Sequence, residues 1–393
     1  MMNLRFFLIA MTLLAVVSDA MLMPFYPQFF EETFGMSNPQ HVGYYIAATC
    51  FTVMFAFPFW AWVARRVPEL NLLVWTQLLA GLLCIYCYWT QSLVEFWIVS
   101  LSMIVFKGSY LLIYPYVMSL EKKGNYSGTI GLLSVIVHFG SILGAILGGY
   151  VVDLYNPRNL FLIMAIGDFV QMAVSFFLIK SSRFDTSRTH EEADKSAEDS
   201  SLVPHGFIFK LGMITLVFYF SAFLIRPFFS LYWESVSVYD SEIVSGFIYA
   251  IPGVVALFAL WLSHRQKQSD NSYKGIVPAM LLGLAGLFLQ SAPSDLVVFL
   301  GRFVYGWAMY HAVVKYDVLL FELSTPKSYA TDYSKIHFFQ NLGVLIASFS
   351  AGILVDLHGL QMPFFVAAAG FIVTLLAYYF SFRSKISLAQ TST

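Results

Sequence analysis

Ionisable side chains within long apolar stretches are the residues of this sequence best suited to chemistry. Asp19, Lys107, Arg226 and His311 each lie in such a stretch, and Lys315 follows His311 at a spacing of four. A charged side chain near the centre of a bilayer costs at least about 2.5–3.5 kcal/mol, so such residues are functional candidates by default. Their types favour proton transfer, or the binding of a charged molecule, over bond-making catalysis.

Asp19 and Lys107 are predicted to lie at similar depths in two different helices, the first and the fourth apolar stretch. In one interpretation Asp19 carries a proton that is taken up outside and released inside. In the alternative, Asp19 and Lys107 form a permanent ion pair that only fixes helix packing. The sequence leaves both open.

The ionisable residues of the C-terminal half also have two interpretations each. Arg226 either offers its charge to an anionic substrate or an acidic side chain near the outer end of its helix, or extends to the lipid headgroups. His311 and Lys315 share one helix face, which suits a path for a substrate or a proton. Alternatively, Asp317 neutralises Lys315.

The composition determines which elements must position these residues. The 393 residues are 59% hydrophobic and only 11% charged, whereas a soluble domain has roughly 25% charged residues. No nucleophile–base pair or phosphate-binding loop is present, so we expect no enzyme, no cofactor and no nucleic-acid partner. Cys50, Cys84 and Cys87 indicate neither a disulfide framework nor a metal site. The sequence predicts an all-α integral membrane protein whose partners are the lipid bilayer, protons and a small molecule, and we expect a monomer.

Twelve transmembrane helices can be placed, since one crossing takes about 20 residues. Most of the 22 Lys and Arg residues fall on one side of these spans, which predicts that both termini are cytoplasmic in the inner (plasma) membrane. The predicted spans are 5–28, 42–64, 70–90, 95–118, 128–152, 159–180, 208–231, 243–263, 275–292, 296–321, 332–355 and 362–382.

An internal repeat divides the chain. At a constant offset of 203, Pro24-Phe25 pairs with Pro227-Phe228, and Gly140, Asp153 and Gly167 pair with Gly343, Asp356 and Gly370. A polar segment, 181–206, separates the two copies and is predicted to be a cytoplasmic linker. We therefore expect six-helix bundles at 1–180 and 207–393, in parallel repeat around a central cavity.

The fifth span carries glycines in an apolar run, at Gly131, Gly140, Gly144, Gly148 and Gly149. Small residues four apart let two helix backbones approach closely in a membrane. The spacing also resembles the fifth-helix signature of antiporters in the major facilitator superfamily, with Ala145 where that family has proline. Pro24-Phe25-Tyr26-Pro27 is similar to an element of its twelve-helix drug–proton antiporter (efflux) group.

Other motifs depart from that family. Ala61 to Arg66 keeps only the basic pair of the usual loop motif, and Lys107-Gly108 stands where the fourth helix usually has Gln-Gly. The resemblance implies that the first, fourth and seventh helices line the cavity and that the sixth is peripheral. Asp168 on the sixth is therefore assigned a structural hydrogen bond.

The resemblance also indicates which residues are the best candidates for the transport site. Aromatic residues make up 18% of the chain, and those near the cavity helices favour an amphipathic organic substrate over an inorganic ion. We predict proton coupling by Asp19, Lys107 and His311. The predicted substrate contacts are Lys107, Tyr110, Tyr114, Arg226, Phe229, His311 and Lys315.

The expected function is secondary active transport, with proton-coupled export of a small organic molecule by alternating access. The cationic residues within the spans favour an anionic substrate, such as a metabolite or a siderophore. The alternatives are a proton-coupled symporter that imports a nutrient, and a receptor or scaffold that kept the fold without transport.

Overall fold

A computed structural model describes residues 2–64, 66–113, 116–117, 126–181, 205–239, 241–265, 272–323 and 329–391. Among these residues every regular element is helical, and eleven helices are long and apolar enough to cross a membrane. A shorter apolar helix at Gly275–Gln290 brings the number to twelve. The predicted all-α membrane fold with twelve spans is confirmed.

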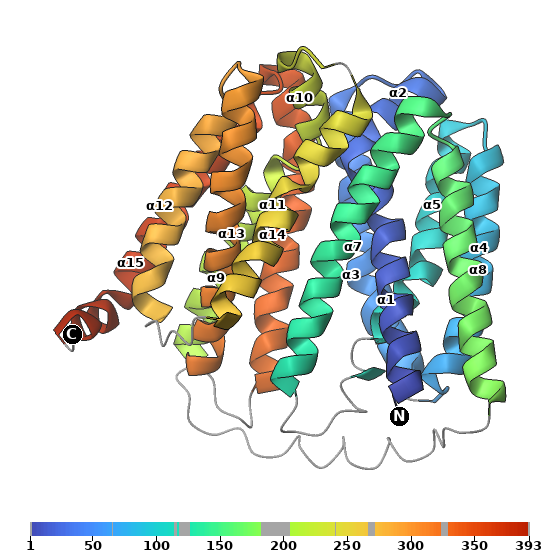
Figure 1. Cartoon of the computed structure of the whole chain (residues 1–393), viewed down its shortest axis with the longest axis horizontal. Coiled ribbons are helices and arrows are strands. Elements are labelled where there is room, and N and C mark those ends of the chain that lie inside the picture. Colours follow the sequence, from blue (N-terminus) through green and yellow to red (C-terminus); the bar gives the residue numbers. More distant parts are fainter. Residues whose placement is uncertain are drawn as a thin grey trace. The chain divides into compact units, whose positions relative to one another are not determined.

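The helices belong to two compact units (Figure 1). Unit 1 consists of Met1–Ser37, Ala48–Lys195 and Ser241–Phe247. Its helices are α1 (Met2–Leu22), η1 (Met23–Phe25), α2 (Tyr26–Phe34), most of α3 (Pro39–Ala64), α4 (Glu69–Trp89), α5 (Leu93–Lys107), η2 (Gly108–Leu112), α7 (Tyr126–Leu154) and α8 (Asn159–Lys180).

Unit 2 consists of Asn38–Ala47, Ser196–Asp240 and Ile248–Thr393. Its helices are α9 (His205–Leu224), α10 (Phe229–Val236), most of α11 (Glu242–Arg265), α12 (Ser272–Gln290), α13 (Asp295–Leu323), α14 (Tyr329–His358) and α15 (Met362–Thr391).

The first and seventh predicted spans are interrupted rather than continuous. A short 3-10 helix, η1, separates α1 from α2 at Pro24, and an irregular segment separates α9 from α10 at Pro227. Proline lacks a backbone N–H and disfavours a helical conformation in the residue before it, which accounts for both breaks. Phe25 and Phe228 then start the second helices with φ, ψ of −115°, 14° and −115°, 10°. The sequence repeat is thus also a repeat of backbone conformation.

Contacts inside the two units follow the same offset. A Cβ added to Gly167 of α8 would lie 2.8 Å from the Oγ of Ser18 on α1, and a Cβ added to Gly370 of α15 would collide with the Oγ of Ser221 on α9. Close helix approach at a small residue is typical of membrane bundles. Each unit therefore brings two of its helices together through the same glycine–serine contact.

The beginnings of α3 and α11 repeat a second contact. In unit 2, Nε2 of Gln40 at the start of α3 donates to Oδ2 of Asp356 on α14, at 2.6 Å. In unit 1, the Oγ of Ser241, just before α11, donates to Oδ2 of Asp153 on α7, at 3.2 Å. The two aspartates occupy equivalent repeat positions and each holds the start of a helix.

Three glycines of α7 pack against α1, and Figure 1 shows the two helices side by side. A Cβ added to Gly140 would lie 2.9 Å from Cγ1 of Val16, and one added to Gly144 would lie 2.6 Å from Cβ of Ala20. Gly148 meets the carbonyl oxygen of Met21, whereas Gly149 meets that of Glu242 at the start of α11. The surroundings of Gly131 lie outside the described residues.

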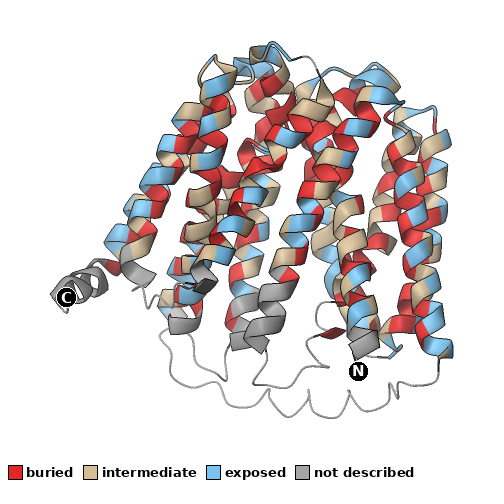
Figure 2. Cartoon of the chain, viewed as in Figure 1, coloured by how far each residue is buried: buried red, intermediate tan, exposed pale blue. Residues whose placement is uncertain are grey.

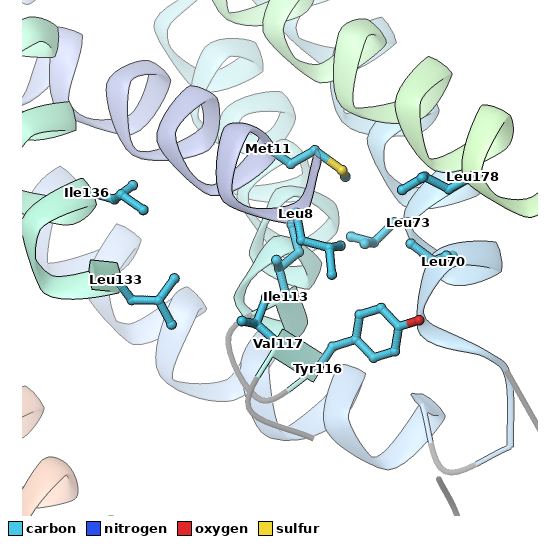
Figure 3. Packing of buried hydrophobic residues seen from close by; sticks show 10 residues of the cluster. All are labelled: Leu8, Met11, Leu70, Leu73, Ile113, Tyr116, Val117, Leu133, Ile136 and Leu178. Carbon is cyan, nitrogen blue, oxygen red and sulfur yellow. The ribbon is translucent and has the colours of Figure 1, made fainter. Parts of the chain in front are cut away.

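Many large apolar side chains are exposed. Figure 2 shows that exposed residues, in pale blue, occur along the length of the helices. Ile98, Ile166 and Phe380 are 64%, 63% and 71% exposed. Soluble proteins rarely expose continuous apolar surface of this kind, so these faces are suited to lipid. Inside unit 1, Figure 3 shows Leu8 and Met11 of α1 grouped with apolar residues of α4, α7 and α8, and of the segment that follows η2.

Candidate functional site

The fourth predicted span breaks at a charged residue. The sequence predicts one helix over 95–118, but α5 ends at Lys107 and continues as the 3-10 helix η2. In an α-helix the carbonyl of Val105 would accept a hydrogen bond from the N–H of residue 109. Here the indole Nε1 of Trp60 on α3 donates to that carbonyl at 2.6 Å. A side chain from another helix therefore stabilises the break beside Lys107.

A buried hydroxyl fixes the other side of the break. Ser109 of η2 lies 2.6 Å from Oγ1 of Thr76 and accepts a hydrogen bond from Nε2 of Gln77 at 3.2 Å. Both partners belong to α4 and are buried. A mid-span 3-10 segment often marks a hinge or a functional site, and this one is held by α3 and α4 together.

Lys107 lies between two carboxylates in unit 1. Its Nζ is 3.6 Å from Oδ1 of Asp19 on α1 and 3.4 Å from Oδ1 of Asp168 on α8. The packing of Ser18 on Gly167 brings the neighbouring residues, Asp19 and Asp168, to the same place. One positive and two negative charges give this group a formal charge of −1. We call these three residues the charge triad.

The two carboxylates of the charge triad differ in surroundings. Asp168 is completely buried and Lys107 is 4% exposed, whereas Asp19 is 40% exposed. The other oxygen of Asp168 lies 3.4 Å from Sγ of Cys84 on α4. Tyr110 of η2 interacts with Asp19. Only one carboxylate of the triad is therefore well exposed.

Asp168, for which no role beside Lys107 was predicted from the sequence, lies at least as close to its ammonium as the predicted partner Asp19. The sequence alone places residues at a depth in the membrane but does not show which neighbour they face. One signal was present in the repeat: Gly167 has a counterpart in Gly370, but the next residue, Asp168, is replaced by Phe371.

Unit 2 lacks the charge triad at the equivalent positions. Ala222 and Phe371 stand where unit 1 has Asp19 and Asp168. The Tyr305 hydroxyl donates to the carbonyl of Ala222 at 3.4 Å, and its ring lies 6.3 Å from that of Phe371. The scaffold is shared by the two units, but the carboxylates of Asp19 and Asp168 have no counterpart at the equivalent positions of unit 2.

Unit 2 instead buries a guanidinium, that of Arg302 on α13, a residue for which no site role was predicted. Its Nε donates to the carbonyl of Ile248 at 3.1 Å, and Nη1 donates to Oε1 of Gln290 at 3.2 Å. Pro252 has no N–H to offer the Ile248 carbonyl, so the arginine replaces the missing helix bond. The Cζ of Arg302 lies 4.0 Å from the centre of the Phe229 ring.

The remaining predicted contacts are spread over unit 2. Arg226 lies in the break between α9 and α10, where it is exposed, with its guanidinium 5.5 Å from the Phe223 ring. Phe229 is fully buried under Arg302. On α13, His311 packs against Trp307, with ring centroids 5.0 Å apart.

Two more predicted contacts complete the set. Lys315 is half-buried on α13 and passes over Gly275 of α12. Tyr114 lies outside the described residues. Tyr110 is thus the only predicted aromatic contact, among the described residues, that is placed beside the charge triad.

Comparisons with known proteins agree with this architecture. The family model of the Major Facilitator Superfamily matches residues 8–306. The multidrug resistance protein MdtG of Dickeya zeae (strain Ech586) is 23% identical over 378 residues, which cover 93% of this chain and 91% of that protein. The POT family transporter PepTSo has a TM-score of 0.77 at 10% identity, with 97% of each chain covered. The nucleoside transporter NupG has a TM-score of 0.70 at 13% identity, covering 97% of this chain and 99% of that one.

The likeness to the solved structures shows the fold, and the family match covers more than half of the chain. The expected resemblance is confirmed, and the chain is a multi-pass membrane transporter rather than an enzyme. This chain belongs to the Major Facilitator Superfamily.

Proposed function

We propose that this protein is a secondary active transporter that exports a small organic molecule in exchange for protons, by alternating access. The observation that carries the proposal is the position of Lys107 between Asp19 and Asp168. A group of charges inside an apolar protein is expensive to retain, and it suits a site that gains and loses a proton.

Protonation of Asp19 is the proposed coupling step. It changes the formal charge of the charge triad from −1 to 0. Because Asp19 is 40% exposed, its carboxylate is the member that a proton can reach. His311 is the proposed second proton-coupling residue; it lies on α13 in unit 2.

The proposed substrate is an amphipathic organic molecule. The relative from Dickeya zeae is named a multidrug resistance protein, which supports export and a broad, drug-like substrate class. Its proposed contacts are Tyr110, Arg226, His311 and Lys315. The guanidinium of Arg302 covers the ring of Phe229, so this ring can contact a substrate only after the two groups separate.

The charge triad changes the argument for an anionic substrate. Lys107 is matched by two carboxylates, so its charge is not available to a substrate anion. The positive charge for a carboxylate-bearing substrate is therefore proposed to come from Arg226, which is exposed. Replacing Arg226 by glutamine should weaken the binding of such a substrate and reduce its dependence on salt concentration, whereas binding of a neutral substrate should be unaffected.

The proposed orientation places both termini in the cytoplasm, in the inner membrane, as the distribution of basic residues favours. A periplasmic reporter fused after Thr393 should then be inactive. An active reporter would contradict this orientation.

Purified protein in proteoliposomes tests the direction and the coupling together. Fluorescent amphipathic anions, cations and neutral compounds are loaded, and a pH gradient of either sign is imposed. Export in exchange for protons predicts that substrate moves against the proton flow and that an uncoupler stops it. Movement with the proton flow would instead identify a symporter. Binding without any movement would favour a receptor, and either result overturns the proposal.

A further inference from the structure

We infer that Asp168 is a positioning residue for proton coupling, acting through Lys107. It keeps the lysine ammonium paired while Asp19 gains and loses a proton. The inference rests on the proposed function, because it assigns a part of the same coupling step to a residue that does not itself carry the proton.

The distances support a lysine shared between two acids. Nζ of Lys107 is almost equally far from the two carboxylates, 3.4 Å from Asp168 and 3.6 Å from Asp19. The ammonium therefore makes a charge contact with both acids at once. A small movement of the flexible lysine chain can therefore move its charge toward either acid.

The burial of the two acids divides their roles. Asp168 is completely buried, with one oxygen near Lys107 and the other 3.4 Å from Sγ of Cys84, so a proton from outside has no direct access to it. Asp19 is the exposed member. The titratable side chains around Lys107 come from four elements: Asp19 of α1, Cys84 and Cys87 of α4, Tyr110 of η2 and Asp168 of α8.

The effect of Asp168 on Asp19 follows from the free-energy cost of burying a charge without a counter-charge. If Lys107 had only Asp19 as a partner, protonating Asp19 would leave an ammonium buried without a counter-charge, which is strongly unfavourable. With Asp168 present, the lysine keeps one counter-charge whether or not Asp19 is protonated.

The test measures the protonation of Asp19 without measuring transport. Dicyclohexylcarbodiimide reacts with protonated carboxyl groups in apolar surroundings, and mass spectrometry of peptides reports labelling at Asp19 as a function of pH. The variants are Asp168→Asn, Asp168→Glu and the double variant Lys107→Met/Asp168→Asn. Ser175→Ala is the matched control, since Ser175 is also completely buried on α8 but carries no charge.

In Asp168→Asn the midpoint of Asp19 labelling should move by at least about one pH unit toward acid, because the full lysine charge then falls on Asp19. Asp168→Glu should restore the midpoint, and Ser175→Ala should leave it unchanged. The double variant should lose the acid shift, because the lysine charge is gone. It also removes both charged neighbours of Asp19, so it keeps the inference testable if Asp168→Asn alone folds poorly.

An unchanged midpoint in folded Asp168→Asn would overturn the inference, as would an equal shift in Ser175→Ala. An Asp19 that is never labelled in the wild-type protein would overturn it too. Failure of the proposed function has a different signature, which is wild-type protein without proton-driven transport while the labelling shifts occur as expected.

Discussion

The ammonium of Lys107 lies 3.4 Å from a carboxylate oxygen of Asp168, although the two residues belong to different helices and both are buried. Two features of unit 1 produce this relationship. The helix break at Gly108 ends α5 at the lysine, and the contact between Gly167 and Ser18 brings α8 close to α1. The Lys107–Asp168 pair therefore depends on two glycines, Gly108 and Gly167, that interrupt the regular apolar pattern of their helices.

Removal of the lysine charge should destabilise the protein. Lys107→Met leaves Asp168 buried without its counter-charge, and breaking one side of a buried pair costs about 3–5 kcal/mol. The apparent melting temperature in detergent should fall clearly. Lys180→Met is the control, because Lys180 is exposed in the last turn of α8 and surface substitutions usually change stability by no more than about 0.5 kcal/mol. Equal melting temperatures for the two variants would show that the charge triad is not a buried pair.

Trp60→Phe should loosen the helix break. The variant keeps an aromatic ring but leaves the carbonyl of Val105 without the indole N–H that now satisfies it. A buried acceptor left without a partner costs about 1–3 kcal/mol. Thermal unfolding measures the loss, and Trp89→Phe serves as control, because Trp89 is 65% exposed. If both substitutions had the same small effect, the proposed role of Trp60 at the break would be wrong.

The glycine face of α7 should not accept a large side chain. In Gly144→Leu the new side chain would begin 2.6 Å from Cβ of Ala20 and 2.7 Å from the carbonyl oxygen of Val17, so α1 and α7 must separate. Transport and thermal stability should both be lost. Gly206→Leu is the control, since a Cβ there meets nothing within 4 Å. Wild-type behaviour of Gly144→Leu would contradict the close approach of α1 and α7.

Arg302 and Pro252 should show an energetic coupling. Arg302→Lys loses the planar group that bonds the Ile248 carbonyl and stacks on Phe229, so stability should fall by about 1–3 kcal/mol. In a Pro252→Ala background, the alanine N–H can satisfy that carbonyl. The same arginine substitution should then cost less. A double-mutant cycle on unfolding free energies with no coupling would refute this account of Arg302.

The sequence predicts the membrane fold well because the hydropathy pattern and the internal repeat can both be read along the chain, without knowing which residues are in contact. Pro24 and Pro227 also mark the interrupted spans, although the interruption itself was not predicted. The break after Lys107 carries no such signal, since Gly108 alone does not end a helix and the stabilising Trp60 lies on another helix. Asp168 was assigned a structural hydrogen bond because the family resemblance implies a peripheral sixth helix. Depth along a helix does not reveal which way a side chain faces, so its place beside Lys107 could not be predicted.

The central claim is that protonation of Asp19 couples the proton gradient to substrate movement. The most direct measurement compares wild-type protein and Asp19→Asn in proteoliposomes, with substrate binding measured on the same preparations. The amide cannot exchange a proton, so we expect gradient-driven transport to be abolished while substrate binding stays largely intact. Full gradient-driven transport by Asp19→Asn would contradict the claim.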